Sequence, residues 1–284
     1  MGLSACQQSE YNPAQPPFNK EGQEGFKLKV LTTIPPLYSF TKNITGGIAD
    51  VENLLPSGAG PHEYSFSPSD IKKIAKARIV IKNGVNLEAW LDKLISAGAG
   101  ENLIVVDTSQ GVELINKDPH IWLSPANAIM QVKNISDALI KADPENSAAY
   151  KNNAETYIQK LKALDREIGE EAAKFKNREF VALHSAFSYF ARDYGLKQAA
   201  VIYEYPDTEP SPGHMAYVMN IIKEKNIRSV FSEPQASSRI VRTIAKDLSL
   251  EVYSLDTLES GTPYPEWYED KMRANISVFK EALD

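Results

Sequence analysis

Short apolar runs alternate with amphipathic stretches in the first part of the chain. Each run is rich in β-branched and aliphatic residues and ends at Gly, Pro, Asn or Asp, as strands do. The runs are Leu28–Thr33, Val51–Leu55, Arg78–Ile81 and Leu103–Val106, and the helical stretches between them are Leu37–Thr45, Ser69–Ala77 and Leu87–Ala97. Strands that alternate with helices in this way predict parallel βα units.

The pattern changes after Pro144. Apolar residues recur every three or four positions from Tyr150 to Phe175, with charged residues between them and no proline. This predicts one amphipathic helix of about 30 residues, roughly 45 Å long. The βα pattern then resumes, with strands expected at Glu179–Leu183, Gln198–Ile202, Arg228–Phe231 and Glu251–Leu255 and helices at Ala186–Tyr194, Pro212–Lys225, Ser237–Leu248 and Pro265–Ala282.

We therefore expect an α/β protein of two lobes with largely parallel sheets. The lobes span residues 26–143 and 177–284, and one long rigid helix at 144–176 joins them. Residues 1–25 are polar, rich in Pro and Gln and without periodicity, which is typical of a flexible tether. Ligands of such sheets usually lie beyond the carboxyl ends of the strands, so the candidate site is expected there.

Composition narrows the functional classes. The chain has 31 Lys and Arg against 37 Asp and Glu, a net charge of −6, and so lacks the basic excess of a nucleic-acid-binding protein. No apolar run approaches the ~20 residues that a membrane-spanning helix needs. One cysteine excludes an internal disulfide and a Cys-based zinc site. With four histidines in all, any imidazole chemistry has few candidates.

The single cysteine has an informative context. Cys6 ends the string Leu3-Ser4-Ala5-Cys6, which matches the end of a bacterial lipoprotein signal, where cleavage leaves a cysteine that carries lipid. The alternative is an ordinary residue near a terminus. The polar tether that follows favours lipid attachment, and with it a location outside the cytoplasm on the bacterial cell membrane.

Three of the four histidines lie where βα elements turn. His62 follows a strand in a Gly/Pro loop, His120 precedes a helix start, and His184 directly follows a strand. Their separations (120 − 62 = 58 and 184 − 120 = 64) exceed any helical pairing, so only the fold could bring them together. Asp256 ends a strand at a matching place. Neutral imidazoles with one carboxylate suit Zn²⁺, although each residue alone could equally be an ordinary polar residue of a loop.

Other candidates have simpler interpretations. His214 follows a Pro/Gly loop at an expected helix start and is interpreted as structural. Glu63 and Asp118 neighbour candidate ligands, but consecutive side chains point apart in an extended segment, so we leave both out. Glu233 is our suggestion for an acceptor that orients a ligand histidine.

Six strings occur together and in order along the chain. They are Gly60–Asp70, Asp118–Pro125, His184–Phe190, Glu209–Pro212, Phe231–Gln235 and Leu255–Leu258. From residue 27 to the end, this set resembles the zinc/manganese class of ABC-transporter solute-binding proteins. The resemblance implies two α/β lobes tied by one long helix and an ion held in the cleft between them. It also implies lipid tethering outside the cytoplasmic membrane and delivery to an ABC permease.

The resemblance carries metal ligation onto His62, His120, His184 and Asp256. In this class the third position is typically His in zinc importers and often Glu in manganese importers, so His184 favours zinc. Many zinc members also carry a long His- and acid-rich loop before the second ligand. Here only Ser109–Lys117 fill that interval, without histidine, which counts against zinc.

We thus expect a monomeric receptor, not an enzyme, that captures Zn²⁺ and passes it to a permease, with Mn²⁺ or iron as the alternative cargo. Two ligands from each lobe would leave no position for a reactive water. A zinc hydrolase is the rival from another class, because three histidines and a water can activate that water. Its usual His-Glu-x-x-His string is absent. Some relatives are assigned as adhesins, but the sequence has no adhesion-specific feature.

Overall fold

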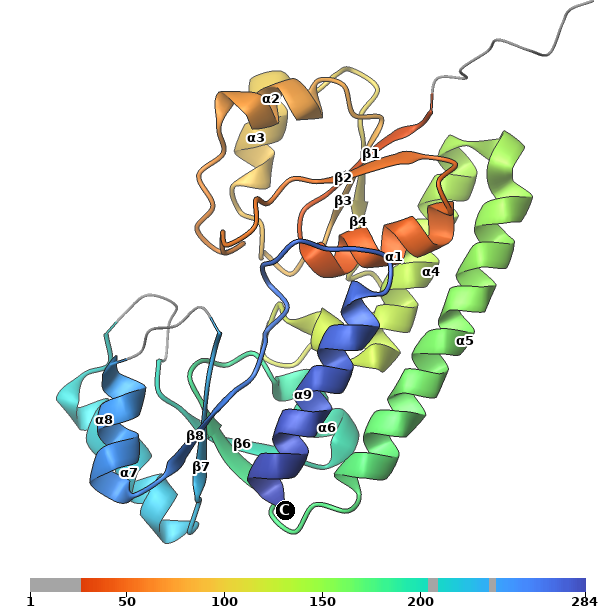
Figure 1. Ribbon diagram of the computed structural model, residues 1–284. Coiled ribbons are helices and arrows are strands. Elements are labelled where there is room, and N and C mark those ends of the chain that lie inside the picture. The colour runs from red at the N-terminus through yellow and green to blue at the C-terminus, as the bar shows by residue number, and fades with distance from the viewer. Residues whose placement is uncertain (1–26, 204–208, 235–238) are drawn as a thin grey trace, which may run out of the picture.

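The computed structural model describes residues 27–203, 209–234 and 239–284. Cys6 and the expected tether lie outside the described residues. The described chain forms two α/β lobes, one above the other, with long helices running beside both (Figure 1). Within this described part of the chain, no helix is both long enough and apolar enough to cross a membrane.

The N-terminal lobe contains a parallel sheet of four strands in the order β2-β1-β3-β4. The strands are β1 (Lys29–Thr32), β2 (Asp50–Asn53), β3 (Ile79–Lys82) and β4 (Ile104–Asp107). Alternate residues face opposite sides of a strand. Leu31 and Val80 therefore pack under α2 (Pro68–Ile74) and α3 (Leu91–Gly98). Val30 and Ile79 pack on the other side, with α1 (Pro35–Thr45) and α4 (Pro125–Ala142).

The C-terminal lobe repeats this architecture, with a parallel sheet in the order β6-β5-β7-β8. Its strands are β5 (Glu179–Ala182), β6 (Lys197–Val201), β7 (Ser229–Ser232) and β8 (Glu251–Ser254). Val181 and Val230 pack against α7 (Pro212–Glu224) and α8 (Arg239–Leu248). Phe180 and Phe231 face the other side, toward α6 (Ser188–Tyr194) and the last helix. The predicted fold class is confirmed.

The expected long helix is α5 (Ser147–Ala172), which follows a 3-10 turn at Pro144–Asn146. Its apolar face is buried along its whole length, from Tyr150 to Ala172. Because no proline or glycine turn interrupts the sequence, the backbone hydrogen bonds continue from one lobe to the other.

The last helix, α9 (Trp267–Leu283), is a second connection between the lobes, which the sequence did not predict. It lies beside α5 and reaches α1 in the N-terminal lobe (Figure 1). At its start, the Ser39 hydroxyl and the Asn43 amide both donate to the Pro265 carbonyl at 2.6 Å. Near its other end, Phe279 packs on the rings of the C-terminal sheet. One hydrophobic core therefore continues through both lobes.

The core face of α5 should carry much of the stability of this frame. Leu161 is completely buried, whereas its neighbour Lys162 is exposed. Leu161→Ala should lower the free energy of unfolding by about 2–5 kcal/mol, because it leaves a cavity. Lys162→Ala should change it by less than about 0.5 kcal/mol. Urea unfolding of both variants measures the difference, and equal effects would contradict this assignment of the buried face.

Candidate metal centre

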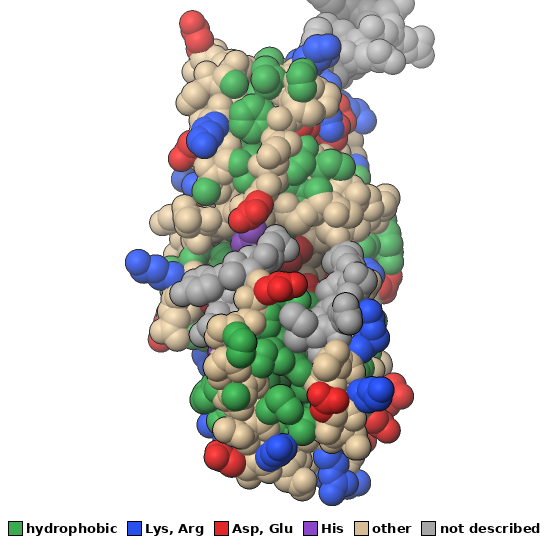
Figure 2. Space-filling view, turned by 90° about the vertical axis from the view of Figure 1, so that its left-hand side faces the viewer, with side chains coloured by type: hydrophobic (Ala, Val, Ile, Leu, Met, Phe, Trp, Pro, Cys, Tyr) green, Lys and Arg blue, Asp and Glu red, His purple; other side chains and the backbone are tan. Residues whose placement is uncertain are grey.

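Three of the four predicted ligands meet between the lobes. The ring centroid of His120 lies 5.4 Å from that of His62 and 5.2 Å from that of His184. The Nε2 atoms of His120 and His184 are 3.4 Å apart. In the space-filling view, part of a histidine side chain is visible near the middle of the molecule, with an acidic side chain beside it (Figure 2). The fold thus brings together residues that are 58 and 64 positions apart (120 − 62 and 184 − 120).

Each histidine sits in a loop at the carboxyl end of a strand. The loop of His62 connects β2 to α2 and is fixed by Trp90, whose indole N–H donates to the Pro61 carbonyl at 2.8 Å. The turn of His120 is held by Asn83, whose amide donates to the Pro119 carbonyl at 2.8 Å. His184 follows β5. This is where parallel sheets usually bind ligands.

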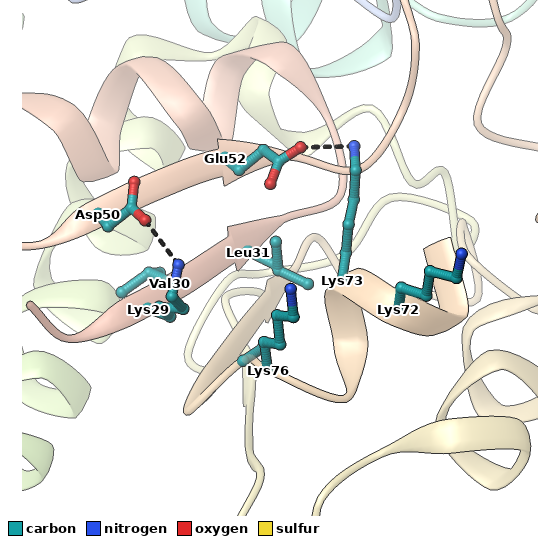
Figure 3. A pocket seen from close by; sticks show the side chains of 9 residues that line it. Lys29, Val30, Leu31, Asp50, Glu52, Lys72, Lys73 and Lys76 are labelled. Carbon is teal, nitrogen blue, oxygen red and sulfur yellow. Dashed lines mark hydrogen bonds and ion pairs between the residues drawn. The ribbon is translucent and has the colours of Figure 1, made fainter. Parts of the chain in front are cut away.

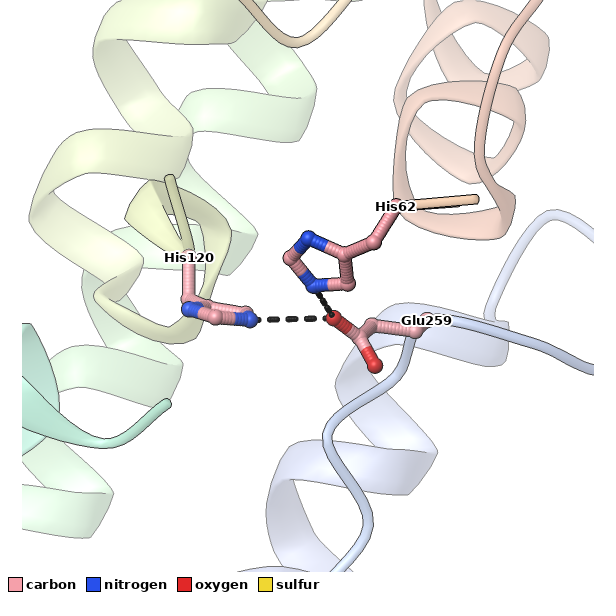
Figure 4. Close-up of side chains that lie close together, drawn as sticks. All are labelled: His62, His120 and Glu259. Carbon is pink, nitrogen blue, oxygen red and sulfur yellow. Dashed lines mark hydrogen bonds and ion pairs between the residues drawn. The ribbon is translucent and has the colours of Figure 1, made fainter. Parts of the chain in front are cut away.

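A fourth candidate donor is Glu259, which the sequence reasoning missed. Its Oε1 atom lies 2.9 Å from Nε2 of His62 and 2.9 Å from Nε2 of His120 (Figure 4). The residues His62, His120 and Glu259 could hold an ion, and so could His184, Glu233 and Glu259, since within each group the donor atoms lie within 4.8 Å of one another. Glu259 is common to both groups. The only sequence signal was a second carboxylate in the same loop as Asp256.

The structure does not bring the Asp256 carboxylate to the histidines, and this corrects our expectation. Its Oδ1 atom accepts a hydrogen bond from the Leu258 N–H at 2.8 Å, and its Oδ2 atom pairs with Lys271 at 2.8 Å. The backbone then reverses at Leu258, whose φ is 60°. Because of this reversal the carboxylate that reaches the cluster comes from Glu259, three residues later, and an apolar pattern cannot reveal such a turn.

Two further carboxylates, Asp118 and Glu233, orient the imidazoles. The Nδ1 atom of His120 lies 2.6 Å from Oδ1 of Asp118. The Nδ1 atom of His184 is hydrogen-bonded to Oε1 of Glu233. Each bond directs the remaining Nε2 atom toward the shared centre, as in many metal sites. Glu233 thus has the orienting role that the sequence suggested, while Asp118, which we set aside as a ligand, has the same role for His120.

Burial and charge together set the protonation of the cluster. Burial lowers the pKa of His120, but its hydrogen bonds to Asp118 and Glu259 outweigh burial and raise this pKa to about 10. Burial would raise the pKa of Glu259, yet its hydrogen bonds to His120 and His62 hold that pKa well below the usual range. At neutral pH, without metal, the centre thus contains an imidazolium beside a carboxylate. A dication can take the place of the proton.

Two other features lie apart from this centre. His214 is in α7, where its Nε2 atom lies 2.9 Å from the Val201 carbonyl oxygen, in agreement with its structural interpretation. A hollow in the N-terminal lobe contains lysines and carboxylates (Figure 3). In it Lys29 pairs with Asp50 at 3.0 Å and Lys73 pairs with Glu52 at 2.5 Å, so much of its charge is neutralised internally.

Comparison with known proteins agrees with this geometry. The profile of the family described as "ZnuA: Zinc-uptake complex component A periplasmic" matches residues 30–282. The chain belongs to this family. It is 33% identical over 283 residues to the high-affinity zinc uptake system protein ZnuA of Bacillus subtilis (strain 168), an alignment that covers 92% of this chain and 89% of that protein.

Solved structures show the same fold. The Zn(II)-bound AdcA of Streptococcus pneumoniae is 34% identical with a TM-score of 0.78, over 91% of this chain and 58% of that chain. This chain thus spans little more than half of that protein. FpvC of Pseudomonas aeruginosa in complex with Mn²⁺ is 30% identical with a TM-score of 0.83, over 90% of this chain and 98% of that one. The resemblance to the zinc/manganese class of ABC-transporter solute-binding proteins, which the sequence motifs indicated, is confirmed.

The raised pKa of His120 can be tested on the metal-free protein. Its imidazole should remain protonated through pH 8 and titrate near 10, as followed by NMR of the ring protons. Because this pKa exceeds the unfolded value of about 6.5, the interaction contributes stability fully below pH 6.5 and loses it as the pH rises toward 10. Asp118→Asn should lower the pKa. A midpoint near 6.5 in the unchanged protein would contradict the proposed network.

Proposed function

We propose that this protein is an extracytoplasmic receptor that captures Zn²⁺ and delivers it to an ABC permease in the membrane. The observation that carries the proposal is the meeting of three imidazoles and one carboxylate between the lobes of a ZnuA-family chain. The proposed ligands are His62, His120, His184 and Glu259, so each lobe's sequence contributes two.

The donor set favours zinc on chemical grounds. Zn²⁺ binds imidazole nitrogen and carboxylate oxygen in four-coordinate sites, whereas Mn²⁺ prefers sites rich in oxygen. Two of the donors are also largely buried, since the side chains of His120 and Glu259 are only 4% and 12% exposed. With Glu259 in the fourth position, no open position remains for the reactive water of a hydrolase.

The protonation of the donors affects zinc capture, and their distribution over two lobes affects zinc release. Zinc must displace the proton of His120, so affinity should fall as the pH falls. Because donors from two lobes share one ion, moving the segments of the C-terminal lobe would break the ligand set. The long helices α5 and α9 oppose a wide hinge motion, so we expect the permease to displace local segments around His184 rather than swing a whole lobe.

Lipid attachment at Cys6 completes the proposal. The string Leu3–Cys6 and the polar residues after it support a receptor that is tethered to the outer face of the cell membrane. The anchor would keep the captured ion close to the permease. The B. subtilis relative is named as part of a high-affinity zinc uptake system, which supports zinc as the cargo here.

Removing single donors tests the ligand set. His62→Ala, His120→Ala and Glu259→Gln should each weaken zinc binding by at least about 100-fold, beyond what losing an orienting residue usually costs. His214→Asn is the matched control, because the His214 imidazole lies apart from the other three histidines. The zinc affinity of this variant should equal that of the unchanged protein. Titration against a chromophoric zinc chelator measures all four variants. Unchanged affinity in Glu259→Gln would remove Glu259 from the ligand set.

A competition between zinc and manganese tests the cargo. The unchanged protein should bind Zn²⁺ far more tightly than Mn²⁺, because a site with three imidazole ligands has a higher affinity for Zn²⁺ than for Mn²⁺. His184→Glu replaces a nitrogen donor with oxygen and should narrow that difference. Manganese is the alternative cargo, because the similar protein FpvC was solved in complex with Mn²⁺. Equal affinity of the unchanged protein for both metals would refute the zinc assignment.

A further inference from the structure

The loop that carries Glu259 contains an unfavourable backbone conformation next to that ligand. Leu258 has a φ of 60° and its side chain is completely buried. A left-handed backbone is uncommon for leucine, because its Cβ atom approaches the following carbonyl oxygen. The side chain belongs to the core that both lobes share. The loop therefore needs a local interaction that stabilises this conformation.

Asp256 supplies that interaction. Its Oδ1 atom accepts a hydrogen bond from the N–H of Leu258, two residues later, at 2.8 Å, and this bond closes an Asx turn. The backbone of Asp256 is itself fixed to α9, because its N–H donates to Asn275 at 2.9 Å and its carbonyl accepts from the Asn275 amide at 2.7 Å. The turn thus starts from an anchored residue and fixes the left-handed one.

The same turn determines where Glu259 points. The Trp122 indole N–H donates to the Thr257 carbonyl at 2.8 Å, which holds the middle of the turn against the N-terminal lobe. The Thr257 hydroxyl donates to Oε2 of Glu259 at 3.2 Å. The other oxygen, Oε1, is left between His62 and His120. The Asx turn adds a direct restraint on Leu258, the residue that immediately precedes Glu259.

We propose that Asp256 is a positioning residue for metal capture, whose Asx turn holds Leu258 in the left-handed conformation and so directs Glu259 at the histidines. This inference rests on the proposed function. The ion pair between Asp256 and Lys271 is a separate interaction. Lys271 is 39% exposed, and ion pairs with such exposure contribute little.

Three substitutions separate the turn from the ion pair. Asp256→Asn keeps an oxygen that accepts from Leu258, and asparagine forms Asx turns as readily as aspartate. Asp256→Ala removes the acceptor, and Lys271→Gln removes only the ion pair. In the full chain, Asp256→Asn and Lys271→Gln should bind zinc within about twofold of the unchanged protein, whereas Asp256→Ala should bind about tenfold more weakly.

A second readout distinguishes positioning from a merely structural role. The visible absorption of bound Co²⁺ reports the geometry of its donors and should change in Asp256→Ala but not in Asp256→Asn. Equal weakening in Asp256→Asn and Asp256→Ala would overturn the proposal, because it would indicate direct ligation by the carboxylate. A lower melting temperature in Asp256→Ala with unchanged zinc affinity and Co²⁺ spectrum would overturn it as well.

Glu259→Gln, measured in the same series, separates this proposal from the proposed function. If Glu259→Gln binds zinc like the unchanged protein, the ligand set itself is wrong, whatever Asp256 does. If Glu259→Gln loses zinc while Asp256→Ala keeps full affinity, only the positioning role of Asp256 is refuted.

Discussion

The metal centre depends on a hydrophobic core that does not stop at the boundary between the lobes. The helices α5 and α9 bury apolar faces against both sheets, and the rings around Phe279 join the C-terminal sheet to the same core that begins at Val30. Close packing of this kind resists deformation. The two sheets are therefore held with the carboxyl ends of their strands facing each other, and loops that are distant in sequence meet there. Neither lobe alone would contain the whole donor set.

The sequence predicted the fold well because parallel sheets and amphipathic helices leave local patterns. The strands appeared as short apolar runs, and α5 as a stripe of buried residues from Tyr150 to Ala172. The partner of a buried face leaves no such pattern, so α9 was predicted as a helix but not as a bridge between the lobes. For a similar reason the sequence suggested Asp256 as the carboxylate of the site, whereas Glu259 is the one beside His62 and His120. The choice between Asp256 and Glu259 depends on the backbone of Leu258, which no periodicity encodes.

Charge explains why the centre can be buried. Glu259 lies inside it, and Asp118 and Glu233 lie behind two of its imidazoles. Such buried carboxylates are costly unless they are paired. Without metal, the proton on His120 provides part of that compensation. With metal, a dication would provide it, while the same carboxylates strengthen the imidazoles as donors. Proton and metal are thus alternative occupants of one electrostatic arrangement, which links affinity to pH without any separate sensing residue.

The hydrogen bonds group the four candidate donors as three and one, whereas the sequence assigns two donors to each lobe. By sequence, His184 and Glu259 both belong to the C-terminal half. The loop of Glu259, however, is fastened to the N-terminal lobe by the bond between Trp122 and Thr257, and Glu259 itself contacts His62 and His120. His184 is held instead by Glu233, which follows a neighbouring strand of the C-terminal sheet. Three donors are therefore held from the N-terminal lobe and His184 from the C-terminal lobe, so a local displacement of the segment around His184 would remove a single donor. Loss of one donor from four is enough to weaken binding strongly, which allows release from a molecule whose frame stays rigid.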